Sequence, residues 1–280
     1  MDLARYWRII RQQKRPVRFV VGHLLMRSGL SPLVRLRQKG FSLRFYPSAI
    51  SLNIWQGLSG AAHPSDLEVL FRSYLKPGDT VIDVGANIGY YSLLASVLVG
   101  EAGHVYAIEA HPRVFRYLQG NLALNKVTNM DARHVALGDK EGTLRFSDIK
   151  ADDMNRVVED GAGIEVAVRR LDDLKISSNR IAILKVDVEG YEFFVLRGAA
   201  GLLKNVECVV YESWEDHFSK YGRSGADVVG LLSGMGFRVV RFAGERIEPV
   251  PQDCVSRVCE DLLAVRDLSA FLKRTGWRMK

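Results

Sequence analysis

A glycine-containing turn between an apolar run and a helical pattern is the first feature of the sequence that could do chemistry. Residues 81–90 read VIDVGANIGY, which predicts a buried strand that turns sharply into a helix. Gly85 and Gly89 allow the backbone to approach a ligand closely, and the helix start offers free amide donors. Asp83, near the strand end, can contact a polar or cationic part of that ligand. The turn therefore predicts a ligand site beyond the carboxyl end of a strand.

An acidic residue at the end of the next predicted strand narrows the choice of ligand. Glu109 follows Gly89 by 20 residues and can accept hydrogen bonds from ribose hydroxyls. The dinucleotide fingerprint G-x-G-x-x-G is absent, as is the lysine of a phosphate-binding loop. Asp83 and Asn87 suit a ligand that carries an amino acid group and no diphosphate. The pattern favours S-adenosylmethionine (SAM) over NAD as the cofactor.

A second group of ionisable residues lies in and after the apolar run at 181–188. Lys185, Asp187 and Glu189 alternate along the chain, so they share one face of a strand. A carboxylate at this place can remove the proton of an acceptor hydroxyl, and Asp187 is the first candidate for this base. Lys185 and Glu189 are candidates for the same catalytic site, or for a structural cluster that caps the following helix.

Two further residues on the same predicted rim complete the candidate set. Glu212 closes the next apolar run, ECVVYE, and is an alternative base. His217 follows in a predicted loop, where a lone histidine is expected to be a surface residue. Asp187, Glu189 and Glu212 offer the oxygen ligands that Mg²⁺ prefers, but nothing in the sequence requires an ion. No metal is therefore predicted.

The elements that must position these residues follow an alternating order. Short apolar runs alternate with helical patterns from residue 80 onward, which predicts an α/β fold with a largely parallel sheet and helices on both faces. Strands are expected at 80–84, 104–109, 133–137, 181–188 and 207–212, with a closing pair at 237–242 and 261–267. Helices are expected at 65–75, 89–99, 112–124, 191–204 and 225–235. Upstream, 41–46 and 49–55 alternate in hydrophobicity and are expected to form a hairpin.

The first 60 residues differ in charge from the rest of the chain. They contain eleven Lys or Arg and one acid, whereas the remaining 220 residues contain 28 basic and 31 acidic residues. Apolar stripes at 3–10 and 17–25 have helical spacing. We predict a basic N-terminal extension of helices and a hairpin at 1–60, before the α/β domain that binds the cofactor at 61–280. Packing of the stripes on the main domain, with solvated arginines, is the favoured interpretation. The alternative is contact with an anionic membrane surface through residues 1–40, which arginine beside aliphatic side chains suits.

The location of the protein is predicted from signals that the sequence lacks. No apolar run is long enough to span a bilayer, and charged residues interrupt every candidate signal peptide. The three cysteines fit neither a disulfide scaffold nor a zinc site. These features predict a cytoplasmic protein with reduced thiols, placed peripherally at the inner face of a membrane if the basic segment binds lipid.

Several motifs occur in the order typical of one enzyme family. They read VIDVGANIGYYS, AIEAHPRVFRYLQGNLALN, VALGD, ILKVDVEGYEFFVLRGA and a closing DLLAV. Over roughly residues 60–266 the chain resembles the FkbM-type family of SAM-dependent methyltransferases. The resemblance implies a Rossmann-like class I methyltransferase fold, with a seven-stranded, mostly parallel sheet whose last strand is antiparallel.

The resemblance also implies roles for individual residues. Glu109 would hold the ribose, whereas Asn121 and Asn125 fit the family's helix pattern as structural residues. The methionine end of SAM would contact Asp83, Gly85, Asn87 and Gly89. The adenine would lie near Ala136, Leu137 and Asp139.

These features predict a SAM-dependent O-methyltransferase that acts on a hydroxyl of a small molecule or glycan, including a lipid-linked sugar. The alternative is an RNA methyltransferase that uses the Arg-rich segment to bind the phosphate backbone. Nucleic acid is the less favoured partner, because aromatic residues are not interleaved with the basic ones and residues 187–190 lack the proline–aromatic pair of amino-group methylases. Asp187 and Glu189 argue against a SAM-binding module without activity, and the glycine spacing argues against an NAD-dependent dehydrogenase.

Overall fold

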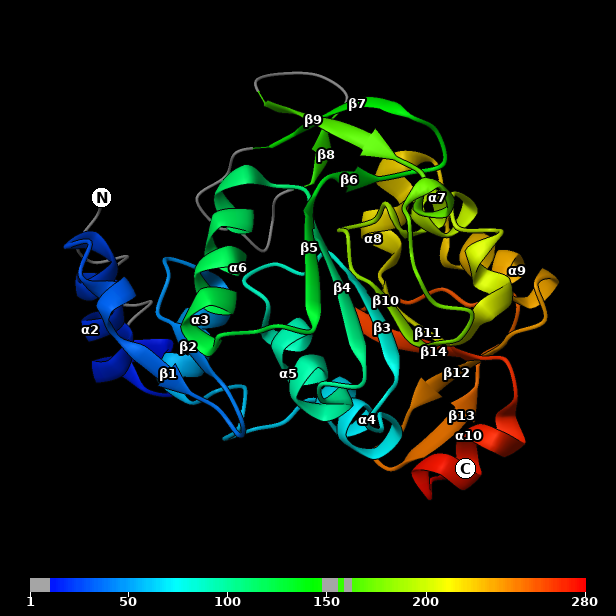
Figure 1. Cartoon of the computed structure of the whole chain (residues 1–280), viewed down its shortest axis with the longest axis horizontal. Coiled ribbons are helices and arrows are strands. Elements are labelled where there is room, and N and C mark those ends of the chain that lie inside the picture. Colours follow the sequence, from blue (N-terminus) through cyan, green and yellow to red (C-terminus); the bar gives the residue numbers. More distant parts are fainter. Residues whose placement is uncertain (1–10, 148–155, 159–162) are drawn as a thin grey trace.

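A nine-stranded sheet forms the centre of the protein in the computed structural model, which describes residues 11–147, 156–158 and 163–280 (Figure 1). The strands are β3 (Thr80–Val84), β4 (His104–Glu109), β5 (Met130–His134), β10 (Ile181–Val186), β11 (Val206–Ser213), β12 (Arg238–Phe242), β13 (Arg246–Pro249), β14 (Glu260–Val265) and β15 (Arg278–Met279). Their spatial order is β15-β13-β12-β14-β11-β10-β3-β4-β5. Neighbours from β11 to β5 are parallel, and β14 is antiparallel to both of its neighbours.

The sheet confirms the predicted Rossmann-like α/β fold but has two strands more than predicted. The seven strands from β12 to β5 form the expected mostly parallel sheet, with the closing strand β14 antiparallel. β13 and β15 extend the sheet beyond β12. Both are short, at four and two residues, so they give no periodic pattern in the sequence.

Helices cover both faces of the sheet, because successive residues of each strand point to opposite sides. One face carries Val81 and Ile183, and the other carries Ile82 and Leu184. The first face is covered by α4 (Asp66–Tyr74), α5 (Tyr90–Val99), α6 (Pro112–Asn125) and α10 (Leu268–Thr275). The second is covered by α7 (Glu192–Arg197) and α9 (Gly225–Gly234). The short helix α8 (Glu215–Phe218) follows β11.

The helix predicted at 191–204 is interrupted, whereas the other four helices predicted from residue 65 onward agree with the structure to within one residue. α7 ends at Arg197, and a separate 3₁₀ turn, Leu202–Asn205, follows. Gly198 lies between them and packs against the backbone of Gly138, where a Cβ atom would be 2.0 Å from the carbonyl oxygen. This close approach between two backbones is a contact that local sequence pattern does not reveal.

A second, smaller sheet replaces what was predicted as one strand at 133–137. The chain leaves β5 at His134 and continues into β6 (Ala136–Leu137). With β7 (Gly142–Phe146), β8 (Val157–Val158) and β9 (Ile164–Arg169), it forms a sheet of order β6-β9-β7-β8. Figure 1 shows this sheet near the end of β4 and β5. Its apolar side forms a separate small core around Val166 and Val168.

The predicted hairpin at 41–55 is wrong. The observed hairpin pairs β1 (Arg35–Arg37) with β2 (Ser42–Arg44), and the segment expected as its second strand is helix α3 (Ala49–Gln56). The side chain of Ser48 accepts a hydrogen bond from the Ser51 amide and caps this helix. An N-terminal cap of this kind outweighs a short alternating pattern.

A helix packs on α3 from the N-terminal side. α2 (Pro16–Arg27) begins at a proline in its first turn, and it confirms the second of the two predicted N-terminal helices. Gly22 of α2 faces α3 so closely that a Cβ atom would lie 2.8 Å from Leu52. The indole of Trp55 donates to the carbonyl oxygen of Arg18 at 2.8 Å. The first predicted helix, at 3–10, lies outside the described residues.

Two asparagines of α6 attach the hairpin to α6 and to the turn after β3. Asn121 accepts a hydrogen bond from the Arg44 amide and donates one to the Ile88 carbonyl, both at 2.8 Å. Asn125 accepts from the Ser42 amide at 2.9 Å and donates to its carbonyl at 2.7 Å. These amide side chains give the edge of β2 the partners that another strand would supply. The structural role predicted for both asparagines is confirmed.

The hairpin also contributes side chains to the main core. Leu36, Leu43 and Phe45 are buried in the same hydrophobic cluster as the residues between α5 and the sheet. Residues on both sides of position 60 therefore share one core. The division of the chain into 1–60 and 61–280 remains a prediction.

Replacing Asn121 with alanine is expected to lower the free energy of unfolding by about 1–3 kcal/mol, because the Arg44 amide and the Ile88 carbonyl lose their partner inside the protein. Urea denaturation measures this loss. Gln119→Ala is the control, since Gln119 is exposed on the same helix and is expected to change stability by less than about 0.5 kcal/mol. Equal effects of the two substitutions would contradict the role of Asn121.

Candidate functional site

A cavity of about 630 Å³ opens at the carboxyl ends of the parallel strands. The chain proceeds from β3 to β4 and β5 in one direction along the sheet, and β10 and β11 lie on the other side of β3. The cavity thus lies where the strand order reverses, the usual ligand site of such sheets. Its walls come from the turn after β3, the end of β4, the second sheet, the loop after β10 and α8.

The turn after β3 is pressed against the loop after β10. Gly85 has a φ of +75°, and a Cβ atom there would lie 1.8 Å from the carbonyl oxygen of Asp187. Only glycine fits at this position, because both the left-handed conformation and the close contact exclude a side chain. Asn87 also has a positive φ, +51°, which asparagine tolerates better than most residues.

Glu109 is held in one orientation at the end of β4. One carboxylate oxygen accepts from the Asn87 amide at 2.9 Å, and the other accepts from the His111 amide at 2.7 Å. The side chain is largely buried but lines the cavity. Each carboxylate oxygen has a further lone pair, so Glu109 can also accept hydrogen bonds from hydroxyl groups of a ligand.

The structure brings most, but not all, of the predicted cofactor residues to the cavity. The lining includes Gly85, Asn87, Glu109, Ala136 and Leu137. Three predicted residues are not part of it. Asp83 is buried behind the wall, Gly89 packs on Leu118, and the Asp139 carboxylate pairs with Arg197.

A buried lysine lies between two carboxylates at the base of the cavity. Lys185 pairs in register with Asp83 on the adjacent strand, and its ammonium group is 3.4 Å from Asp83 and 3.0 Å from Asp187. The ring of Tyr91 lies over the ammonium, 5.5 Å from it. Burial alone would lower the pKa of Lys185, but the attraction of Asp187 and Asp83 outweighs it, so the pKa lies above its usual value. Lys185 is therefore charged.

Asp187, Glu212 and Asp261 differ in acidity although they lie on the same face of the sheet. Burial, opposed by the charge of Lys185 and reinforced by that of Glu212, raises the pKa of Asp187. Hydrogen bonds from His217 and from the Cys259 thiol outweigh burial and hold the pKa of Glu212 below its usual value. Burial and the charge of Asp187 raise the pKa of Asp261 to about 7. The set thus contains one acid whose pKa is lowered, Glu212, and two whose pKa values are raised, Asp187 and Asp261.

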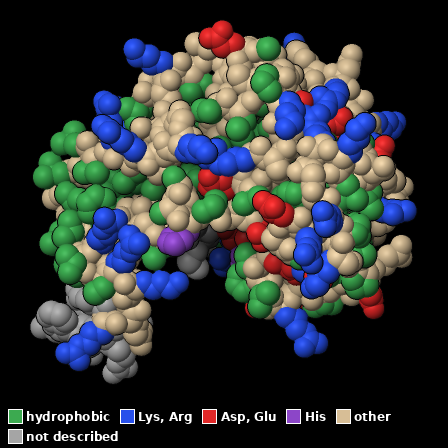
Figure 2. All heavy atoms as spheres, turned by 90° about the horizontal axis from the view of Figure 1, so that it is seen from below, with side chains coloured by type: hydrophobic (Ala, Val, Ile, Leu, Met, Phe, Trp, Pro, Cys, Tyr) green, Lys and Arg blue, Asp and Glu red, His purple; other side chains and the backbone are tan. Residues whose placement is uncertain are grey.

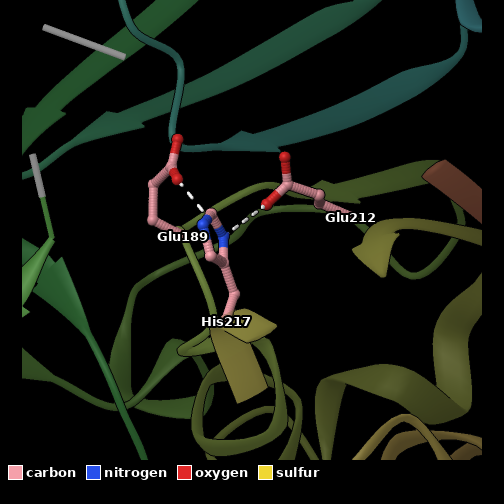
Figure 3. Close-up of side chains that lie close together, drawn as sticks. All are labelled: Glu189, Glu212 and His217. Carbon is pink, nitrogen blue, oxygen red and sulfur yellow. Dashed lines mark hydrogen bonds and ion pairs between the residues drawn. The ribbon is translucent and has the colours of Figure 1, made fainter. Parts of the chain in front are cut away.

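His217 lies in the cavity wall, so the expectation of a surface residue is wrong. Its Nδ1 atom is 3.4 Å from Glu189 and 3.3 Å from Glu212, and only 12% of its side chain is exposed (Figure 3). The ring of Trp214 lies 4.2 Å away, centre to centre. The turn at α8 returns His217 towards the strand ends, which is a consequence of tertiary packing. The sequence signal was its position five residues after Glu212.

Sequence reasoning also missed Tyr91, Asp261 and Ile50. Tyr91 covers Lys185, and Ile50 of α3 lines the cavity. Asp261 is paired in register with Glu212, in the strand that closes the sheet. The sequence could have indicated Asp261. Glu212 ends the apolar run of β11, and Asp261 comes directly before the apolar run of β14. Antiparallel pairing of these two strands brings the two acids together.

The fold and the site define a Rossmann-like α/β enzyme whose cavity at the strand ends has both polar and apolar walls. The methyltransferase FkbM domain matches residues 83–239, and the chain belongs to this family. The 31-O-demethyl-FK506 methyltransferase FkbM of Streptomyces tacrolimicus is 31% identical, over 63% of this chain and 81% of that protein. The hexuronic acid methyltransferase AglP of Haloferax volcanii is 27% identical, over 65% of this chain and 74% of that protein. The protein is a SAM-dependent methyltransferase.

Solved structures of methyltransferases resemble the chain at low identity. Methyltransferase FkbM from Methylobacillus flagellatus KT is 15% identical, with a TM-score of 0.45, over 76% of this chain and 54% of that one. A SAM-dependent methyltransferase from Aquifex aeolicus is 18% identical, with a TM-score of 0.43, over 72% of this chain and 90% of that one.

The cavity fits SAM by the chemistry of its lining. Glu109 presents a fixed carboxylate of the kind that accepts from ribose hydroxyls. An apolar wall beside it suits a purine ring and is formed by Ile108, Val135, Ala136, Leu137 and Phe146. Polar residues of the lining, Asn87 and Asp187, suit the amino acid part and the positive sulfur.

The stability gained by replacing Asp261 with asparagine is expected to grow as the pH rises from about 4 to above 7. The unfolded chain releases this proton near pH 3.9, whereas the folded protein holds it up to about pH 7. Wild-type protein therefore loses stability through this group over that interval, and Asp261→Asn does not. Urea denaturation of both proteins across the interval measures the difference. A difference that stays constant with pH would contradict the raised pKa of Asp261.

Proposed function

We propose that the protein transfers the methyl group of SAM to a hydroxyl of a small molecule or glycan. The observation that carries this proposal is Asp187, a cavity-facing carboxylate of raised pKa beside the charged Lys185. A base that releases its proton nearer neutrality is better matched to an oxygen acceptor than an ordinary aspartate. The names of two relatives, a hexuronic acid methyltransferase and a 31-O-demethyl-FK506 methyltransferase, support an acceptor of this class.

Some residues of the cavity bind the cofactor, and others take part in proton transfer. SAM, when bound, supplies a methyl group on a positively charged sulfur, which an oxygen attacks in line with the breaking C–S bond. Glu109 binds the ribose, and Asn87 and the Gly85 turn lie along the methionine end. Asp187 accepts the acceptor's proton, and Lys185 stabilises the negative charge that develops on the oxygen. Glu212 is the second candidate for the base.

The remaining lining supports a sugar-containing acceptor. The rings of Tyr191 and Trp214 offer flat apolar surfaces of the kind on which a sugar ring packs. Lys220 and Arg156 add positive charge at the cavity wall. Aromatic and basic side chains together suit a sugar that carries a carboxylate or a phosphate. A lipid-linked sugar phosphate has both a sugar ring for the aromatic side chains and a phosphate for the basic ones.

Glu109→Ala is expected to weaken binding of S-adenosylhomocysteine (SAH) by about 10- to 100-fold, because charge-assisted hydrogen bonds to the ribose are lost. Asp187→Asn is expected to leave SAH affinity within about threefold of wild type and to reduce methyl transfer by about 10²- to 10⁴-fold. Titration calorimetry measures the first quantity. Transfer of a labelled methyl group to hexuronic acid glycans and sugar phosphates measures the second.

Glu101→Ala is the matched control for Glu109→Ala, since Glu101 is an exposed acid between α5 and β4. It should leave SAH binding unchanged. A folded wild-type protein that does not bind SAH would contradict the cofactor site. Undiminished transfer by Asp187→Asn would move the role of base to Glu212.

We further propose that the N-terminal region holds the enzyme against an anionic membrane. Val17, Leu24, Leu30 and Leu33 expose 75%, 59%, 53% and 76% of their surface. Exposed arginines surround them at positions 18, 27, 35 and 37. Figure 2 shows hydrophobic side chains gathered, with Lys and Arg around them, at the end of the molecule where Figure 1 places α2. Leucine beside arginine suits the interface of an anionic leaflet.

This proposal places the enzyme in the cytoplasm, at the inner face of a membrane, where the leaflet is negatively charged. Contact would be peripheral. Within the described ranges, the helices lack the length and apolar character needed to cross a bilayer. Attachment beside the bilayer would bring the cavity close to lipid-linked sugars.

The double substitution Leu24→Glu and Leu33→Glu is expected to weaken binding to anionic vesicles by at least about tenfold, because two apolar contacts with lipid are replaced by like charge. Co-sedimentation with phosphatidylglycerol-containing and phosphatidylcholine vesicles measures the binding. Val258→Glu is the control, since Val258 is exposed at 67% in the loop before β14. These point substitutions are preferable to removal of residues 1–40, which would delete the buried Leu36. Equal binding by both variants, or salt-dependent binding to RNA instead of vesicles, would contradict membrane attachment.

A further inference from the structure

Three side chains from separate segments converge in the cavity wall with metal-binding atoms facing one another. Glu189 comes from the loop after β10, Glu212 from the end of β11 and His217 from α8. One oxygen of each carboxylate and the imidazole Nδ1 all lie within 4.8 Å of one another. Figure 3 shows the two carboxylates approaching the imidazole from opposite sides. All three residues line the cavity, so the group is accessible to a ligand there.

The backbone fixes the position of two of these residues. Gly190 has a φ of +102°, and a Cβ atom there would lie 2.6 Å from the carbonyl oxygen of His217. The loop that carries Glu189 is therefore in direct contact with α8. Glu189 itself has a φ of +59°, which is uncommon for a residue other than glycine. The fold holds Glu189 beside His217 at a conformational cost.

The thiol of Cys259 orients the third residue of the group, Glu212. Cys259, like the other two cysteines a free thiol, donates to one oxygen of Glu212 at 3.0 Å. The other oxygen of Glu212 is the one that faces His217. Donors that hold the unused oxygen of a carboxylate are typical of the groups around metal ligands.

The distances suit a shared cation in place of the hydrogen bond between His217 and Glu212. Nδ1 carries at most one proton, so it cannot serve two carboxylates equally, yet it lies 3.3 Å from one and 3.4 Å from the other. Charge-assisted hydrogen bonds are shorter, at about 2.7–2.9 Å. Ligand atoms that each lie about 2.1 Å from a common cation are separated from one another by about 3.0–3.4 Å. The two separations from Nδ1, 3.4 and 3.3 Å, fall in the second range, and all three atoms lie within 4.8 Å of one another.

The acids at this end of the sheet have different partners. Asp83 and Asp187 are paired with the buried Lys185. Glu189 and Glu212 instead face the imidazole of His217.

We propose that Glu189, Glu212 and His217 bind a divalent cation, Mn²⁺ or Zn²⁺, at the acceptor end of the cavity. Mixed carboxylate and imidazole ligands suit these ions better than Mg²⁺ or Ca²⁺, which prefer oxygen alone. Three protein ligands leave coordination positions open, as in catalytic metal sites. The set differs from the carboxylate triad considered from the sequence, because Asp187 is paired with Lys185.

The role of the cation rests on the proposed O-methylation, whereas its binding does not. The cation coordinates and polarises the acceptor hydroxyl, whose proton passes to Asp187. The oxygen then forms its bond to the methyl carbon as the C–S bond breaks, and the sulfur keeps the electron pair of that bond. Polarisation by a metal ion lowers the pKa of a coordinated hydroxyl and so eases the proton transfer.

Titration of chelator-treated full-length protein with Mn²⁺, followed by electron paramagnetic resonance, tests the site directly. Wild-type protein should bind one Mn²⁺ per chain, and Zn²⁺ should displace it. His217→Ala and Glu189→Gln should each weaken binding by at least about tenfold. Asp216→Asn is the matched control, since Asp216 is an exposed acid on the same helix as His217, and it should bind Mn²⁺ as wild type does.

SAH binding by every variant separates the loss of a ligand from the loss of the fold. A variant that binds SAH but not Mn²⁺ supports the site. Wild-type protein that binds SAH but takes up neither ion at millimolar concentration overturns it, as does Mn²⁺ binding that persists in both His217→Ala and Glu189→Gln. Metal binding without SAH binding would instead contradict the proposed methyl transfer and leave the metal site standing.

Discussion

The ammonium group of Lys185 and its two carboxylates form the interaction on which the rest of the site depends. A charged lysine in the middle of a sheet is stable only when opposite charges replace the water that it loses. Asp83 supplies one from the adjacent strand and Asp187 the other, so β3 and β10 must be neighbours in one fixed register. The same register presses the Gly85 turn against the Asp187 carbonyl. The cofactor turn and the acidic loop thus occupy one rigid arrangement.

The alternation of side chains along strands then decides what faces the cavity. Lys185 points to the same side of the sheet as the apolar residues beneath α5, as do Glu212 and Asp261 further along. That face is apolar along the length of the strands and becomes ionic at their carboxyl ends. The aromatic ring of Tyr91 lies between the two environments, over the ammonium. Burial and mutual repulsion raise the pKa of Asp187 and Asp261, whereas hydrogen bonds lower that of Glu212. Acids of different pKa in one place are typical of a proton-transfer site.

Local signals made much of this arrangement predictable from the sequence. The run from Thr80 into Gly85, the acid at 109 and the alternation at 185–189 each indicate an element and its end. Contacts between distant segments account for the rest. His217 contacts Glu212 only because of the turn at α8, and Asp139 pairs with Arg197 instead of lining the cavity. The two-residue strands of the second sheet are too short to give a periodic pattern. At 49–55 two local signals competed, and the helix cap outweighed the alternation.

The attachment of the N-terminal region to α6 fixes the distance between α2 and the cavity. Ile50 of α3 forms part of the cavity wall, and α3 packs on α2 through Gly22. Asn121 and Asn125 fix the adjoining hairpin to α6. Folded structure, and not a flexible tether, therefore joins the exposed side of α2 to the cavity. Any surface on which α2 rests would therefore lie at a set height from the cavity mouth, with no hinge of unstructured chain between them.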